Sequence, residues 1–76
     1  MKLVPVTSSM LLAVGYDATK RELEAVFSSG QVWRYQEVPR RVYQELLKAE
    51  SKGSYMRSCV IGLYPEYRLR RRQIPQ

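Results

Sequence analysis

The sequence predicts an α+β domain in which a three- to four-stranded antiparallel β-meander packs against two C-terminal helices. Apolar and polar residues alternate along the first half of the chain, short polar turns interrupt them, and the apolar spacing then becomes helical. Parallel strands need long crossover connections, so short turns favour antiparallel pairing. The 76 residues suffice for a single domain, 1–76, with 65–76 as a basic C-terminal arm or edge strand.

Three segments alternate as strands do, namely 10–16, 21–27 and 31–36. In the first, Leu12 falls on the same face as Val14, and Leu11 falls on the opposite face. Gly30, in the turn before the third segment, suits a positive φ angle. Residues 3–6 add a short edge strand, where a proline is tolerated.

The second strand alternates most cleanly, because Leu23 and Ala25 point inward while Glu22 and Glu24 point outward. The two glutamates could pair as an acid and a base. We interpret them instead as a solvated strand face, since charged side chains are ordinarily exposed.

Three aromatic residues of the strands, Phe27, Trp33 and Tyr35, suggest a base-stacking platform on the sheet. Their positions in the alternation place them on the inward face of the strands, which favours a place in the core instead. A chain this short buries little surface and needs large side chains there.

Helical spacing begins at Pro39, which suits a first helical turn. Val42 and Leu46 begin the apolar stripe on the inner face of this helix. Ser51 and Gly53 are predicted to end the helix. A second helix then extends to a stop at a proline. This helix is predicted to be capped by Ser54 and to end at about Tyr64. Its inner face is predicted to carry the apolar residues Met56, Val60 and Leu63.

The absence of histidine and the presence of a single cysteine, Cys59, restrict the chemistry. The chain cannot form an internal disulfide, lacks the ligands of a zinc site and has no histidine to serve as a base or to activate a thiol. We therefore expect no enzyme, no catalytic residue, no metal and no cofactor, with Cys59 as a small buried apolar residue. The N-terminal residues resemble neither a signal peptide nor a membrane span, which favours a cytoplasmic protein without a membrane partner.

A net charge of +6 attracts polyanions. The sharpest candidate anion site is the turn before the second helix, with Lys52, Gly53, Ser54 and Arg57. Helix N-termini bind phosphate through free N–H groups and the helix dipole. An ordinary capped turn would use serine and glycine in the same way, so this alternative stays open.

Two further groups of cations complete the candidate site. Arg40 and Arg41 lie in the first turn of the other helix, where positive charge opposes the helix dipole; this indicates a binding role or simple surface tolerance. The basic arm contributes one aromatic residue and four arginines, which bind nucleic acid or only aid solubility. These are Tyr67, Arg68, Arg70, Arg71 and Arg72.

A joint pattern of short motifs runs from Val6 to Tyr64. Gly-Tyr-Asp follows a strand at 15–17, Val-Pro precedes a helix at 38–39, and Ala-x-Ser-x-Gly-x-Tyr follows that helix at 49–55. In this pattern the chain resembles the KTSC domain. Trp33, where the family more often has tyrosine, and Met-Arg at 56–57, in place of an expected Phe-Asn, depart from it.

The resemblance implies a domain of the kind found at the C-terminus of a lysyl-tRNA synthetase and as short bacterial and phage proteins. By that association it implies an accessory role in RNA binding. We therefore expect a small non-catalytic module that binds nucleic acid, RNA or tRNA foremost, through phosphate contacts. The alternative is a protein–protein interaction module that meets an acidic protein through a sheet edge or the basic arm. A homodimer that extends the thin core is compatible with either.

Overall fold

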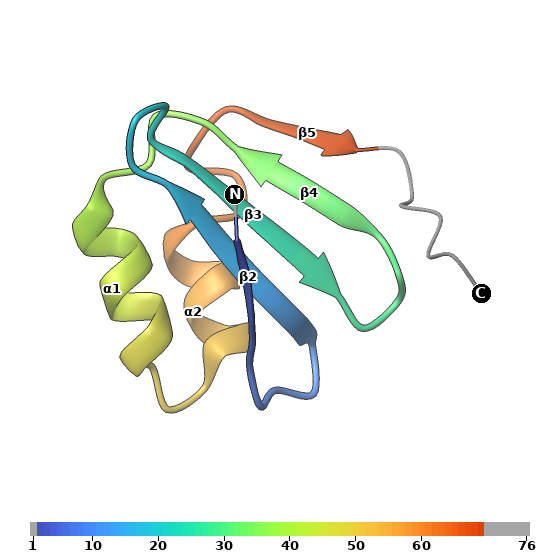
Figure 1. Ribbon diagram of the computed structural model, residues 1–76. Coiled ribbons are helices and arrows are strands. Elements are labelled where there is room, and N and C mark those ends of the chain that lie inside the picture. The colour runs from blue at the N-terminus through green and yellow to red at the C-terminus, as the bar shows by residue number, and fades with distance from the viewer. Residues whose placement is uncertain (1, 70–76) are drawn as a thin grey trace.

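The computed structural model describes residues 2–69, so the predicted site residues Arg70, Arg71 and Arg72 lie outside the described residues. The elements are β1 (Leu3–Pro5), β2 (Leu11–Asp17), β3 (Glu22–Phe27), β4 (Val32–Tyr35), α1 (Arg40–Lys48), α2 (Lys52–Cys59) and β5 (Glu66–Leu69). Both helices cover the same face of the sheet (Figure 1), which confirms the predicted α+β class. No helix formed by residues 2–69 is long and apolar enough to cross a membrane.

Within residues 2–69, the sheet has five antiparallel strands in the order β1-β2-β3-β4-β5. The predicted N-terminal edge strand is present as β1. The C-terminal segment, for which an arm or an edge strand was predicted, forms β5 beside β4 after the chain has passed through both helices (Figure 1). The connections β1–β2 and β3–β4 lie at one end of the sheet, where the Ser28 N–H donates to the Met10 carbonyl at 2.8 Å.

A β-bulge in β2 changes the predicted faces of that strand. The register between β2 and β3 shifts between Leu11 and Ala13. Leu11 is consequently fully buried together with Val14, whereas 53% of Leu12 is exposed. The prediction that Leu12 shares a face with Val14 is wrong, because one extra residue in a strand reverses the alternation beyond it.

The core lies between the sheet and the two helices. Val42 and Leu46 of α1 and Met56 of α2 contribute to it as their helical spacing predicts. The buried cluster consists of Leu11, Val14, Leu23, Ala25, Tyr35, Val38, Val42, Leu46, Met56 and Val60. Cys59 is half-buried against this cluster.

The boundaries of α2 differ from the prediction at both ends. Ser51, not Ser54, is its N-cap, because the Ser51 hydroxyl accepts the Ser54 N–H at 3.3 Å; Gly53 therefore lies inside α2. The helix ends at Cys59 and turns follow it, with Gly62 at φ +83°. Leu63, predicted on the inner face of a longer helix, is 64% exposed. Apolar residues continue at helical spacing as far as Leu63, although the backbone is no longer helical after Cys59.

Candidate functional site

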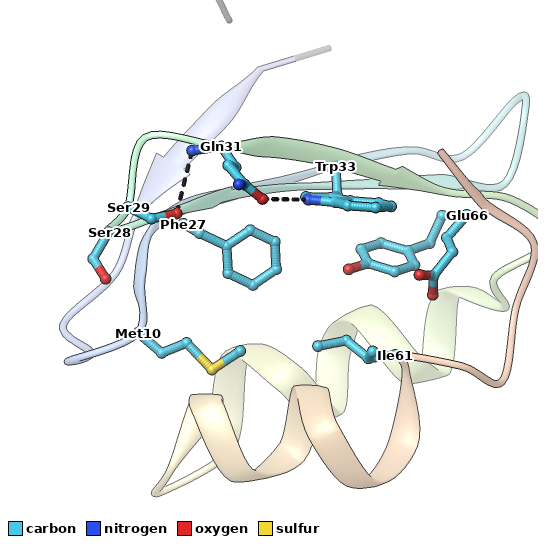
Figure 2. Close-up of a pocket in the computed structure, with 9 residues that line it drawn as sticks. Met10, Phe27, Ser28, Ser29, Gln31, Trp33, Ile61 and Glu66 are labelled. Atoms are coloured by element: carbon cyan, nitrogen blue, oxygen red, sulfur yellow. Dashed lines mark hydrogen bonds between the residues drawn. The ribbon is translucent and has the colours of Figure 1, made fainter. Parts of the chain in front are cut away.

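An open pocket of about 350 Å³ lies between the sheet and the end of α2. We call it the aromatic pocket. It is lined by Met10, Phe27, Ser28, Ser29, Gln31, Trp33, Tyr35, Ile61 and Glu66. Figure 2 shows the rings of Phe27 and Trp33 on the side of the sheet, with the side chains of Met10 and Ile61 facing them from the opposite side.

The aromatic residues divide between the core and this pocket. Tyr35 is only 2% exposed and belongs to the core, as predicted. Phe27 and Trp33 are half-buried, so one part of each ring packs on the core and another part lines the pocket. The Trp33 indole N–H donates to the Gln31 side-chain oxygen at 3.1 Å (Figure 2), which fixes the orientation of the ring.

Two polar groups lie at the β5 side of the aromatic pocket, where Glu66 is the cross-strand neighbour of Tyr35. Burial, and then the negative charge of Glu66, raise the pKa of Tyr35 to about 12. One carboxylate oxygen of Glu66 accepts the Gly62 N–H at 3.0 Å. Among the described residues that line this pocket, Glu66 alone carries a charge.

A second pocket, of about 220 Å³, lies between the β1–β2 loop and the start of α2. We call it the α2 pocket. It is lined by Thr7, Ser8, Ser9, Met10, Glu50, Ser51, Lys52, Gly53 and Arg57. Three predicted anion-binding residues, Lys52, Gly53 and Arg57, are thus brought together, and Met10 lines this pocket as well as the aromatic pocket.

Several contacts at the α2 pocket fit the capped-turn alternative. The Ser51 hydroxyl accepts from the Ser54 N–H and donates to the Ser54 hydroxyl at 3.0 Å. The Lys52 ammonium donates to the Ala49 carbonyl at 3.0 Å. A Cβ on Gly53 would lie 3.2 Å from the Cβ and the sulfur of Met10, a tight contact that favours glycine there for packing alone. Arg57 takes no part in the cap; it is exposed, and its guanidinium contacts the sulfur of Met10 at 4.0 Å.

A third pocket, of about 170 Å³, is lined by Ser29, Gly30, Gln31, Arg68 and Leu69. We call it the Arg68 pocket, and it shares Ser29 and Gln31 with the aromatic pocket. Arg68 pairs with Trp33 across β4 and β5, which places the two side chains on the same sheet face. Tyr67 pairs with Arg34 on the opposite face, away from the aromatic pocket.

Arg40 and Arg41 are not part of this group of pockets. They open α1, a helix of nine residues that spans about 13 Å, whereas Lys52 opens α2 beyond its far end. Arg40 lines a separate pocket of about 420 Å³ beside the rings of Tyr16 and Tyr43, which stack with centroids 5.2 Å apart.

Glu24 overturns the interpretation of the β3 glutamates as a solvated face. It is fully buried, and the Arg34 guanidinium donates to its carboxylate at 2.6 Å. The hydrogen bond to Glu24 is also the main cause that raises the pKa of Arg34. Glu22 lies farther from Arg34, at 3.7 Å, and its side chain is 13% exposed. The alternation correctly placed Glu24 on the face away from the helices, but the Arg34 side chain of the neighbouring strand packs against it there.

Sequence reasoning did not select Met10, Gln31, Ile61 or Glu66, although all four line the aromatic pocket. They come from a loop, a turn, the segment after α2 and the last strand. No motif or spacing relates them, because only the tertiary fold brings these segments together. Phe27 and Trp33 carried the one available signal, their aromatic character.

Comparisons with known proteins agree with this fold. The family model of the KTSC domain matches residues 7–64. A crystal structure of a KTSC domain protein from Yersinia pestis superposes with a TM-score of 0.88 at 32% identity, covering 90% of this chain and 96% of that one. A protein of Stutzerimonas stutzeri is 47% identical over 55 residues, which cover 72% of this chain and 78% of the relative.

A lysine–tRNA ligase of Nostoc sp. contains a similar segment. It is 36% identical over 56 residues, which cover 74% of this chain and 10% of the ligase. A protein of Tsukamurella paurometabola is 41% identical over 56 residues and is matched along 84% of its length. The shared segment thus occurs both as most of a small protein and as a minor part of a large enzyme.

Proposed function

Since this chain belongs to the KTSC domain family, we propose that it is a small non-catalytic module that binds single-stranded nucleic acid, RNA foremost. Contacts to phosphates supply most of the affinity, and the aromatic pocket holds a base. The net charge of +6 favours a polyanionic partner. The similar segment within an enzyme whose name includes tRNA supports RNA as that partner.

The continuity of three pockets carries the proposal. Met10 connects the α2 pocket to the aromatic pocket, and Ser29 and Gln31 connect the aromatic pocket to the Arg68 pocket. Cations lie at both ends of this surface, with Arg57 at one end and Arg68 at the other. Proteins that bind single strands combine cations along the backbone with aromatic rings on which bases stack.

The position of the rings favours single strands over a duplex. Phe27 and Trp33 lie in a recess between the sheet and α2, so a base reaches them only after it has left a stack (Figure 2). Arg40 and Arg41 lie apart from this surface and are assigned no phosphate contact here. Lys52 contributes to phosphate binding when its ammonium gives up the hydrogen bond to the Ala49 carbonyl and binds a phosphate instead.

Fluorescence anisotropy of a labelled RNA octamer tests the proposal. Three phosphate contacts, from Lys52, Arg57 and Arg68, predict a slope of about −2 in log affinity against log salt, because each contact contributes about −0.7 for single strands. Affinity then falls roughly twentyfold between 50 and 200 mM salt. Contacts from the residues after Leu69 would steepen this slope.

A double charge removal, Arg57→Gln with Arg68→Gln, is expected to reduce the slope by about 1.4. Lys20→Gln is the matched control, because Lys20 is an exposed cation in the β2–β3 turn at the other end of β2. No binding at low salt would contradict the proposal. If Lys20→Gln lowers the affinity as much as each charge removed in the double variant does on average, the assignment of phosphate contacts to this surface is wrong.

A further inference from the structure

The aromatic pocket has two unlike walls that suit one flat heteroaromatic ring. Phe27 and Trp33 offer π faces, and Met10 and Ile61 offer polarizable and aliphatic groups from the opposite side (Figure 2). Its volume of about 350 Å³ lies at the small end of the range for ligand pockets. It therefore suits a single base better than a stack of bases.

The charge inside the pocket is opposite to the charge around it. Glu66 is the one charged group among the described lining residues. The adjoining pockets are net positive, because Lys52 and Arg57 outnumber Glu50 in the α2 pocket and Arg68 lines the other. A carboxylate repels phosphate and only accepts hydrogen bonds. The backbone of a bound strand therefore stays at the arginines, and the group that reaches Glu66 must be a hydrogen-bond donor.

The four bases differ in the donors that they present. Guanine has two adjacent donors, N1–H and the N2 amino group, on its Watson–Crick edge, which match a carboxylate. Adenine and cytosine place one amino group beside an acceptor, and uracil places N3–H between two carbonyl acceptors, which a carboxylate disfavours. The Gly62 N–H holds one oxygen of Glu66 at 3.0 Å, and a carboxylate has about four lone-pair sites, so capacity remains.

From these walls and this carboxylate, we infer that the aromatic pocket selects an unstacked guanine base, whose ring packs on Trp33 and whose donor edge bonds to Glu66. The inference rests on the proposed nucleic-acid function and adds a base preference to it. The Tyr35 hydroxyl, which like any tyrosine hydroxyl is neutral near pH 7, adds a polar group to the same lining.

The tryptophan provides a direct reporter, because Trp33 is the only one in the chain. Its fluorescence is titrated with uridine octamers that carry one central guanosine, adenosine, cytidine or inosine. We expect the guanosine octamer to quench Trp33 most and to bind roughly 5- to 150-fold more tightly than the adenosine and cytidine octamers. Inosine lacks the N2 amino group, so its octamer should bind about tenfold more weakly than that with guanosine.

Glu66→Gln tests the carboxylate itself. The amide keeps an acceptor oxygen for Gly62 but directs an amino donor at the donors of guanine, so the preference for guanosine should disappear while salt-dependent binding remains. Glu50→Gln is the matched control, because it removes the same charge from the α2 pocket and leaves the aromatic pocket unchanged. It should change the affinity for all octamers by one common factor.

Equal affinity and equal quenching for the four octamers would overturn the inference and leave the nucleic-acid function standing. A guanosine preference that persists in Glu66→Gln would also overturn it. Failure to bind any octamer at low salt would overturn both proposals. The inosine comparison uses the wild-type chain, so it decides the matter even if Glu66→Gln does not fold.

Discussion

The buried ion pair between Glu24 and Arg34 makes a quantitative prediction about stability. The Arg34 guanidinium and the Glu24 carboxylate lie 2.6 Å apart, and the Glu24 side chain is fully buried while 24% of the Arg34 side chain is exposed. Removing one partner of a buried pair costs about 3–5 kcal/mol. Because Arg34 remains partly hydrated, we expect Arg34→Met to lower the free energy of unfolding by about 3 kcal/mol, the lower end of this range.

That loss is large for so small a domain, since about 0.05–0.15 kcal/mol per residue corresponds to roughly 4–11 kcal/mol in total. Urea denaturation, followed by the fluorescence of Trp33, measures it without the ionic screening that guanidinium chloride adds. Glu22→Gln is the internal control, because Glu22 lies 3.7 Å from the same arginine. It should cost less than Arg34→Met, because 3.7 Å is too long for a hydrogen bond and glutamine keeps the size of the side chain.

The double variant Glu24→Leu with Arg34→Met should be more stable than Arg34→Met alone, because it removes the buried charge together with its partner. The reasoning fails if Arg34→Met costs no more than Glu22→Gln. In that case the Glu24–Arg34 pair would behave as an exposed surface pair, and the burial of Glu24 would have no energetic consequence.

Three further predictions concern other parts of the chain. Tyr35 has a pKa raised from 10 to about 12 in the folded protein, so its contribution to stability is full below pH 10 and is lost as pH rises toward 12. The full loss is at most about 3 kcal/mol, and about half of it falls between pH 9 and pH 11. Urea titrations at these two pH values measure that half, and Tyr35→Phe should remove it. Gly53→Val should lower the free energy of unfolding, measured by thermal denaturation, by about 1–3 kcal/mol, since even a Cβ at this position lies 3.2 Å from Met10. Adding Met10→Ala should restore part of this loss, and no restoration would contradict the contact. Truncation after Leu69 should reduce the salt slope of RNA binding by up to about 2 if its three arginines contact phosphates, and an unchanged slope would show that they do not.

The periodicity of the sequence determined the class of fold and the assignment of most residues to the core. Leu23 and Ala25 are fully buried as their alternation predicts, and Val42 and Leu46 are buried at helical spacing. Such local patterns are reliable because each strand and helix must bury one face whatever its partners. The predicted turns also hold, with Gly30 at φ +94° between β3 and β4.

Local patterns failed where the outcome depended on a second segment. The bulge between Leu11 and Ala13 arises from the pairing of β2 with β3, and it reversed the position of Leu12. Alternation also predicted which sheet face Glu24 lies on, but it did not predict that Glu24 is buried there, because Arg34 from the neighbouring strand packs over it. A strand pattern contains no information about the length or charge of the side chain beside it.

The candidate site illustrates the same division. Charge and composition pointed to a polyanionic partner, and the turn at 51–54 was identified as one place for it. Only the tertiary structure decided that Lys52 and Arg57 adjoin the aromatic pocket through Met10, and that Arg40 and Arg41 lie apart. The walls of that pocket come from four segments separated along the chain. Their meeting follows from sheet register and helix packing, which no single stretch of sequence specifies.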